Sequence, residues 1–434
     1  MSTLHDRLAD LAGDAPAGGP APDLWDVGRR YHRRRRAGTV AALTVVLLAV
    51  SSVLGLGWVR SDPGIEPAAP GTAPALPERF WEPSPWLPGT DGEPTGPLAA
   101  LVPAQRQGWW SSTEGVVGVS ATTGEYRFLD LPEDSGRDHA LSPDGTKVAY
   151  WATGQTRETP QTNGGQEKTV AAVAVWHAGT GEVTRHEVGT DHGLAPSDLL
   201  WGDSERLVLS WGQEMVGDDA PPSEQGGSSF RVGLRLWDLA DEAGPVALDV
   251  GEGVQASNGR GQVLLTSSRR PVLDLESGER SRVEITRSMG IGVSALSPDG
   301  SAVAYPRGNS NPNRLFLAEG GKAPRLLLDE RVWAAIGWAD DDTVAFVSRD
   351  VDLDPIPAAI ESLDIRTGAR QVLIDTGSFQ PRPGNLASDL LAVDPVAYDE
   401  PATPWDPRVA SGLAVLVSAI ALLALWGWRR RVRP

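Results

Sequence analysis

Cysteine is absent from this chain of 434 residues, and lysine occurs only at Lys147, Lys168 and Lys322. A chain without cysteine has no disulfide bond, no thiolate metal site and no thiol nucleophile, so its domains are held together by packing. The scarcity of lysine beside abundant alanine, glycine and proline indicates translation from a GC-rich bacterial genome.

Motifs of catalysis and of nucleotide binding are missing as well. The sequence contains no G-x-S-x-G nucleophile elbow, no H-E-x-x-H zinc motif and no phosphate-binding P-loop. Its six histidines show no spacing typical of metal ligands. We therefore expect no catalytic residue, no metal, no cofactor and no enzymatic activity.

Two uncharged apolar runs interrupt this polar sequence, one of 23 residues at 37–59 and one of 20 residues at 409–428. A helix rises about 1.5 Å per residue, so each run is long enough to cross a hydrocarbon core of about 30 Å. The sequence therefore predicts two transmembrane helices.

Arginines flank both runs on their outer sides, at residues 29–36 and 429–433. By the positive-inside rule, the segments 1–36 and 429–434 are cytoplasmic and the chain between the two spans lies outside the bacterial plasma membrane. Residues 1–37 carry a net charge of +2 and residues 409–434 one of +4, which leaves −24 for the segment between them. So acidic a domain excludes nucleic acid as a partner.

An eleven-residue sequence occurs twice in the predicted external part, as LSPDGTKVAYW from Leu141 and as LSPDGSAVAYP from Leu296. Pro, Asp and Gly favour a tight turn, and the alternation after it is typical of a strand. Outer turns of the form small-Gly-polar alternate with inner turns along the chain. The outer turns lie at 123–125, 180–182, 243–245, 277–279, 320–322 and 367–369, and the inner turns at 143–145, 202–203, 258–259, 298–300, 340–342 and 384–385.

This repetition predicts an all-β fold, a six-bladed β-propeller over residues 99–398, or seven blades if Trp109 and Trp110 begin a further one. The first outer turn precedes every inner turn, so we expect the last strands, near residues 386–393, to share a blade with those near 116–131. Residues 60–98 are rich in proline and predict an extended stalk, although Phe80, Trp81 and Trp86 favour packing on the propeller over a partner contact. Residues 399–408 form the linker to the second span.

The two LSPDG sequences, with Leu200-Trp201-Gly202-Asp203 and Gly337-Trp338-Ala339-Asp340, resemble the WD-repeat-like propellers of TolB type. The resemblance covers the predicted external domain only and implies a fold rather than an activity. TolB-like proteins are soluble and carry a separate N-terminal α/β domain, and this chain differs in both respects.

Three long insertions join second to third strands and are expected to gather on one face of the ring, where loops carry function. The candidate binding residues in and beside these insertions are Arg157, Glu158, Lys168, Glu214, Asp218, Asp219, Asp350, Asp352 and Asp354. The last three, with Glu361, also follow the spacing of a calcium loop. Pro355 stands where that loop needs glycine, so a solvated acidic loop is favoured over a calcium site.

The expected function is that of a membrane-anchored scaffold or sensor, which binds another envelope protein or a small ligand without catalysis. The N-terminal segment leaves an alternative open, because Leu4, Leu8 and Leu11 lie at helical spacing. The arrangement resembles that of bacterial anti-σ regulators, which implies a cytosolic regulatory protein as partner, but the zinc ligands of that family are missing. A quinone-dependent dehydrogenase is a distant third reading, from the D-x-x-T-G sequence at 364–368.

Overall fold

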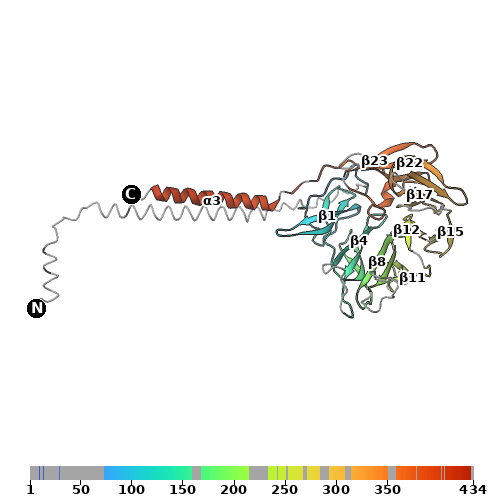
Figure 1. Cartoon of the computed structure of the whole chain (residues 1–434), viewed down its shortest axis with the longest axis horizontal. Helices are drawn as coiled ribbons and strands as arrows, with labels where there is room; N and C mark the ends of the chain where they lie inside the picture. The colour runs from blue at the N-terminus through green and yellow to red at the C-terminus, as the bar shows by residue number, and fades with distance from the viewer. Residues whose placement is uncertain are drawn as a thin grey trace, which may run out of the picture. The chain divides into compact units, whose positions relative to one another are not determined.

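The computed structural model consists of two units (Figure 1). One unit contains residues 1–65 and 405–434, and the other residues 66–404. The described residues are Ala9, Gly13, Arg29 and the ranges 73–158, 168–214, 233–241, 243–250, 253–266, 271–283, 293–307, 314–349, 358–377, 379–401, 403–404 and 406–431.

The larger unit consists of six antiparallel sheets, each made of strands in chain order. Blade 1 holds β1 (Leu98–Gln107), β2 (Ser112–Ser120) and β3 (Tyr126–Phe128); blade 2 holds β4 (Asp134–Leu141), β5 (Lys147–Thr153), β6 (Val170–His177) and β7 (Val183–Glu187); blade 3 holds β8 (Leu194–Trp201), β9 (Arg206–Gln213), β10 (Gly233–Asp238) and β11 (Val246–Ala247). Blade 4 holds β12 (Val254–Ser257), β13 (Gln262–Leu265), β14 (Pro271–Asp274) and β15 (Arg280–Arg282); blade 5 holds β16 (Ala295–Leu296), β17 (Ala302–Arg307), β18 (Arg314–Glu319) and β19 (Arg325–Leu328); blade 6 holds β20 (Val332–Trp338), β21 (Thr343–Arg349), β22 (Ala358–Asp364) and β23 (Arg370–Gly377).

The blades follow one another around a ring in chain order (Figure 1), so the six-bladed propeller predicted from the sequence is confirmed. Five of the predicted outer turns join the third and fourth strands of a blade, and the sixth, at 123–125, joins β2 and β3, the last two strands of blade 1. Five of the inner turns join the first and second strands. Trp109 and Trp110 begin no seventh blade, because they lie at the tip of the hairpin formed by β1 and β2.

The ring closes where the two ends of the domain meet. Leu386 pairs antiparallel with Ala100 of β1, the amide of Leu101 donates to the carbonyl of Asn385 (2.8 Å), and that of Ala387 to the carbonyl of Ala99 (3.0 Å). The predicted sharing of a blade by the first and last strands is thus confirmed at residues 385–387. Beyond them the chain differs from the expectation, because Ser388–Ala392 form the 3-10 helix η2 and not a strand.

The described part of the expected stalk packs on the propeller. Pro77 pairs with Val396, Arg79 with Asp375 of β23, and Gly89 with Phe128 of β3, so residues 73–97 run along blades 6 and 1. Phe80 is fully buried, and its ring meets that of Phe379 edge to face at 5.1 Å. The predicted extended stalk thus lies against the propeller over residues 73–97, and the packing on the propeller favoured for Phe80 and Trp81 is confirmed. Proline-rich sequence can lie along a sheet edge as readily as extend into solvent.

Burial explains the residues of the repeated strands. Val148, Tyr150, Val303 and Tyr305 are fully buried, as their alternation predicted. Ala149 and Trp151, which alternate with Val148 and Tyr150 and so point to the other face of the sheet, are buried too. Both faces of a blade are covered by the blades beside it.

Residues Pro407–Arg431 form the 25-residue helix α3. Within the part of the chain that the structure describes, no helix combines the length and apolarity needed to cross a membrane. Residues 37–59, expected to form the first span, lie outside the described residues.

Candidate functional site

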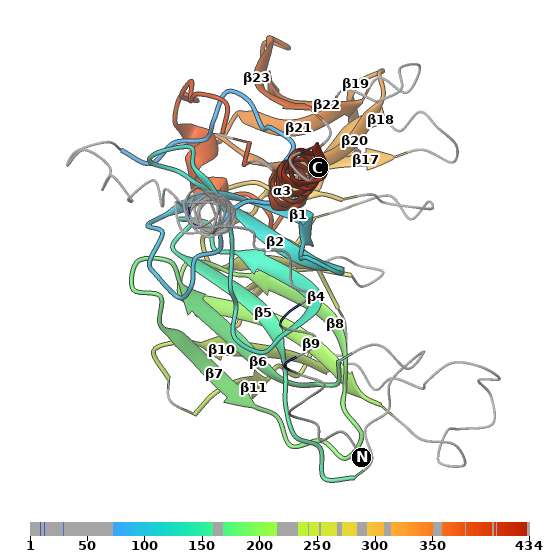
Figure 2. The ribbon, with the colours of Figure 1, turned by 90° about the vertical axis from the view of Figure 1, so that its left-hand side faces the viewer.

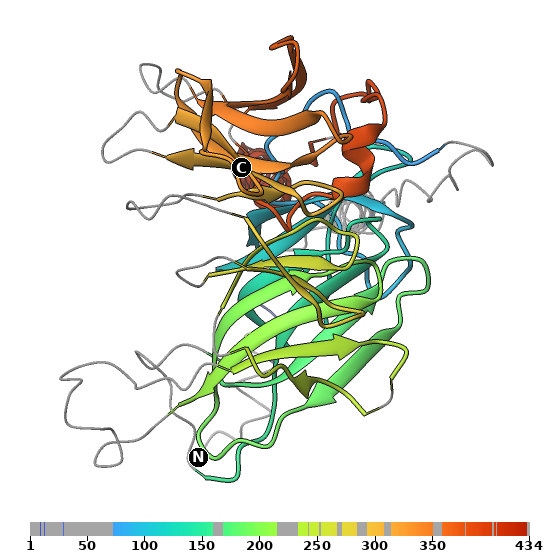
Figure 3. The same ribbon diagram turned by 90° about the vertical axis from the view of Figure 1, so that its right-hand side faces the viewer.

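The antiparallel blades give the propeller two different faces. The turn face carries the predicted inner and outer turns, and the loop face carries the other connections, among them the tip that joins β1 to β2. Seen from the side, η2 marks the turn face on the left of Figure 2 and on the right of Figure 3.

On the loop face, three predicted binding residues contact the connection between β7 and β8. Arg157 Nη1 lies 3.4 Å from Asp191 Oδ1, and Glu158 Oε2 lies 3.5 Å from His192 Nε2. The amide of Glu214 donates to the carbonyl of Gly193 at 2.9 Å. Lys168 instead contacts β4, where its Nζ donates to the carbonyl of Asp134 at 2.7 Å. The other predicted residues, Asp218, Asp219, Asp350, Asp352 and Asp354, lie outside the described residues. The grouping of insertions from three blades therefore stays a prediction.

Glu361, the last residue of the calcium pattern, has a structural role. It lies in β22, only 5% exposed, and forms an ion pair with Arg370 of β23. Burial by itself raises the pKa of Glu361, but hydrogen bonds from Arg370 and Ser348 outweigh burial and hold the pKa below its ordinary value. A carboxylate committed to Arg370 is not a calcium ligand. Among the described residues, no three acidic or histidine side chains are grouped as metal ligands.

The turn face is organised by the two SPDG turns, which have the same geometry. In one, Ser142 Oγ donates to Asp144 Oδ1 at 2.6 Å and accepts from the amide of Lys147 at 2.9 Å. In the other, Ser297 Oγ donates to Asp299 Oδ1 at 2.6 Å and accepts from the amide of Ala302 at 2.9 Å. These side chains are satisfied within their own turns, so they fix the shape of the turns and are not available for a ligand.

A pocket of about 300 Å³ opens at the centre of the turn face. Its polar lining includes Arg260 from the β12–β13 turn, and Ser388 and Asp389 from η2, while Ile336 and Trp338 of β20 contribute apolar surface. Blades 4, 5 and 6 and the closing segment therefore all contribute to one hollow. Such a volume is at the lower end of the range for small-molecule sites.

Charge at this pocket is mixed. Partial desolvation and the neighbouring carboxylate of Asp144 raise the pKa of Asp389, and the cation of Arg260 opposes the shift. The amide of Asp389 donates to the carbonyl of Pro143 at 3.0 Å, which ties η2 to the first SPDG turn. Ring closure thus places Asp389 beside residues that are distant from it in the sequence.

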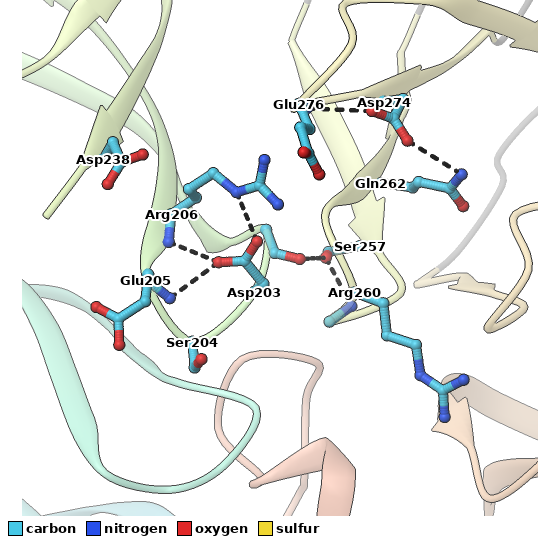
Figure 4. Close-up of polar contacts among 12 residues, drawn as sticks. Asp203, Ser204, Glu205, Arg206, Asp238, Ser257, Arg260, Gln262, Asp274 and Glu276 are labelled. Carbon is cyan, nitrogen blue, oxygen red and sulfur yellow. Dashed lines mark hydrogen bonds and ion pairs between the residues drawn. The ribbon is translucent and has the colours of Figure 1, made fainter. Parts of the chain in front are cut away.

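A second hollow, of about 570 Å³, is a groove between blades 3 and 4 (Figure 4). It is lined by Asp203, Ser204, Glu205, Arg206, Asp238, Arg260 and Glu276. Arg206 Nε lies 2.6 Å from Asp203 Oδ2, and Glu205 is engaged by Lys147 of blade 2 at 2.8 Å. Four carboxylates against two arginines leave the groove acidic.

Arg260 borders both hollows. In Figure 4 its side chain extends from the β12–β13 turn with no dashed contact to its guanidinium, and among the described residues no ion pair to it is found. Sequence reasoning missed Arg260 and Asp389. The sequence indicated them only weakly. Both residues follow predicted inner turns, and the inner turns of a propeller converge around its axis.

No known protein family matches the sequence, and no curated protein is similar to it. Similar solved structures include TolB from Acinetobacter baumannii (16% identity, TM-score 0.38, covering 66% of this chain and 65% of that one). Others are a candidate TolB from Agrobacterium tumefaciens (15%, 0.37, 67% and 93%) and the hydrazine synthase of Kuenenia stuttgartiensis (15%, 0.34, 56% and 67%). The chain thus spans just under two thirds of the Acinetobacter protein. The six sheets, and not these distant likenesses, establish the propeller.

Proposed function

We propose that this chain is a membrane-anchored, extracytoplasmic propeller that binds another protein or a small envelope ligand at its turn face, without catalysis. The observation that carries the proposal is the central pocket joined to the acidic groove through Arg260. Ring closure and the turns of several blades build this surface, and a rigid scaffold suits recognition.

Anchoring is supported by the sequence and by the exposed side chains of α3. The consecutive residues Val415, Leu416 and Val417 are 69%, 55% and 61% exposed, and Leu423 is exposed as well. Consecutive positions point to different sides of a helix, so apolar surface is not confined to one face. We propose that residues 409–428 and 37–59 lie in the plasma membrane with both chain ends cytoplasmic. Resistance of the membrane-bound chain to extraction by carbonate tests this.

Binding at the turn face is tested by charge reversal at Arg260. Full-length protein is captured with its crosslinked partners from detergent-solubilised native membranes, as wild type, as Arg260→Glu and as Arg282→Glu. Arg282 is an exposed arginine on β15 of the same blade, outside both hollows, and so provides a matched control. We expect partners to be lost with Arg260→Glu and kept with Arg282→Glu. Identical partners for all three proteins would refute binding at this surface.

A regulatory role of the N-terminal segment is the second candidate. Ala9 and Gly13 are helical, in agreement with the spacing of Leu4, Leu8 and Leu11. We propose as the alternative that this segment docks on a cytosolic transcription regulator, as in anti-σ proteins. Deletion of residues 2–28 then removes a transcription component from the captured partners, and capture unchanged by the deletion would contradict this role.

A further inference from the structure

The hairpin of β1 and β2 presents two adjacent tryptophans to solvent. Trp109 is 53% exposed and Trp110 is 96% exposed, at the turn where the amide of Gly108 donates to the carbonyl of Ser111 at 2.8 Å. Tryptophan is a large side chain that is mostly buried in folded proteins. Two such rings at one tip therefore indicate a contact with something other than water.

The hairpin holds these rings away from the blade. β1 and β2 remain paired up to Gln107 and Ser112, and from Pro103 onward the side chains of β1 are no longer buried. Below the tip, Arg106 forms an ion pair with Asp130, and the amide of Gln107 donates to the carbonyl of Pro85 at 2.8 Å. The tip is thus a fixed projection.

The tip also differs from the rest of the domain in charge. Residues 107–113 read QGWWSST and contain no ionisable side chain, whereas the segment between the two predicted spans carries −24. Because the tip carries no charge, it cannot form an ion pair with a charged protein surface. A bilayer interface suits it, because tryptophan favours the headgroup region and because uncharged residues there are not repelled by anionic lipid.

We propose that Trp109 and Trp110 enter the headgroup region of the bilayer in which the chain is anchored. This inference rests on the anchoring proposed above. Tyr398, whose hydroxyl donates to the carbonyl of Ala121 at 2.9 Å, fixes the end of the propeller next to the last residue of β2. From there the linker 399–408 reaches about 33–36 Å when fully extended. The hairpin is of similar length, since the ten residues of β1 span about 34 Å. A membrane that holds residue 409 is therefore within reach of the tip.

Because the chain contains no cysteine, a single introduced cysteine can be labelled specifically. The full-length chain carries an environment-sensitive fluorophore on Ser111→Cys, beside the tryptophans, and is reconstituted into vesicles of phosphatidylcholine and phosphatidylglycerol. The control carries the same fluorophore on Lys322→Cys, on the exposed β18–β19 turn of blade 5. Lipids spin-labelled near the headgroup should quench the probe at residue 111 and leave that at residue 322 unchanged. The double change Trp109→Ser and Trp110→Ser should abolish the quenching at residue 111.

Flotation of the same vesicles separates the two proposals. A chain that does not float with the vesicles after carbonate treatment refutes the anchoring, and the inference about the tip fails with it. A chain that floats while its probe at residue 111 is no more quenched than that at residue 322 overturns the inference and leaves the anchoring intact. Shielding of residue 111 only after addition of a solubilised membrane-protein fraction would assign the tip to a protein partner and would also overturn it.

Discussion

Two junctions of the ring, between blades 2 and 3 and between blades 5 and 6, contain the same residues: an Ala-Leu-Ser-Pro sequence in one blade and a tryptophan in the next. In the first, Trp201 Nε1 donates to the carbonyl of Ala140 at 2.9 Å; in the second, Trp338 Nε1 donates to the carbonyl of Ala295 at 3.2 Å. The tryptophan of one blade thus recognises the inner strand of the blade before it. The repeated residues therefore specify how neighbouring blades meet, as well as the turn within each blade.

The surroundings of the two tryptophans differ. Trp201 packs in a cluster with Trp151, Trp211 and Trp237, whereas Trp338 packs with Phe346 and smaller side chains. Trp201 is 2% exposed and Trp338 is 8% exposed. The same hydrogen bond is thus embedded in two cores of different composition, so hydrogen-bond geometry and core packing vary independently around this ring.

The third strands of blades 3 and 6 also differ at one matching position. Arg235 and Glu361 each lie three residues before the aspartate that ends the strand. Arg235 lies over the ring of Trp211 at 3.7 Å, and burial lowers its pKa, whereas Glu361 is paired with Arg370. The fold accepts either sign of charge there, provided that the partner changes with it.

The largest effect is expected from removing the junction tryptophans. Trp201→Ala leaves a cavity in the cluster of tryptophans and should lower the free energy of unfolding by about 3–5 kcal/mol. Trp338→Ala should lower it by less, because Trp338 is more exposed to solvent and packs against smaller side chains. Urea denaturation of the full-length protein in detergent, followed by circular dichroism, measures both. Trp110→Ala, at the exposed tip, is the control and should leave the midpoint unchanged. Equal losses for both junctions would contradict the difference in packing.

The matched glycines of the SPDG turns give the next contrast. Gly145 and Gly300 have φ values of 74° and 72°, so alanine is strained at both by about 1 kcal/mol. A Cβ at residue 145 would overlap the backbone carbonyl of Leu98, whereas one at residue 300 meets the flexible side chain of Gln262. Gly145→Ala should therefore lower the thermal midpoint more than Gly300→Ala. A larger loss from Gly300→Ala would show that Gln262 is held rigidly.

Sequence patterns predicted the ring well because its turns are local. A glycine at positive φ, such as Gly145 or Gly300, marks a turn whatever surrounds it, and alternation then fixes which side chains are buried. The path of residues 73–97 could not be predicted in this way. Proline-rich sequence has no period, and the pairing of Pro77 with Val396 depends on the far end of the chain.

The candidate site was harder to predict for the same reason. Arg260 and Asp389 come together only because the ring closes, and a single sequence does not give that geometry. Glu361 shows the opposite error, since its spacing from Asp350 resembles a metal loop, while strand register places it opposite Val372 and within reach of Arg370, two residues along β23. Spacing is informative within one turn or strand and loses meaning across a boundary between a loop and a strand.

The position shared by Arg235 and Glu361 offers a smaller effect. Glu361→Gln removes the anion from a buried pair and should cost about 1–3 kcal/mol, because among the described residues Arg370 then keeps only the exposed Glu330 as a charged partner. Arg235→Gln removes a stacked cation without leaving a buried charge unpaired, so its cost should be below about 1 kcal/mol. Denaturation midpoints at pH 7 compare the two. A greater loss from Arg235→Gln would mean that stacking on Trp211 outweighs the ion pair.

The smallest effect is the dependence of that contribution on pH. The folded pKa of Glu361 lies below its ordinary value of 4.5, so on acidification the unfolded chain takes up the proton first. The stabilisation is complete above that ordinary value and is lost as the pH falls through the lower, folded value. Glu361→Gln has no such proton to gain, and the uncharged glutamic acid and glutamine are nearly isosteric. The difference in midpoint between wild type and Glu361→Gln should therefore shrink as the pH falls from 7 towards 3, while that between wild type and Arg235→Gln should not follow this titration. A constant difference for Glu361→Gln would mean that the carboxylate contributes through packing alone.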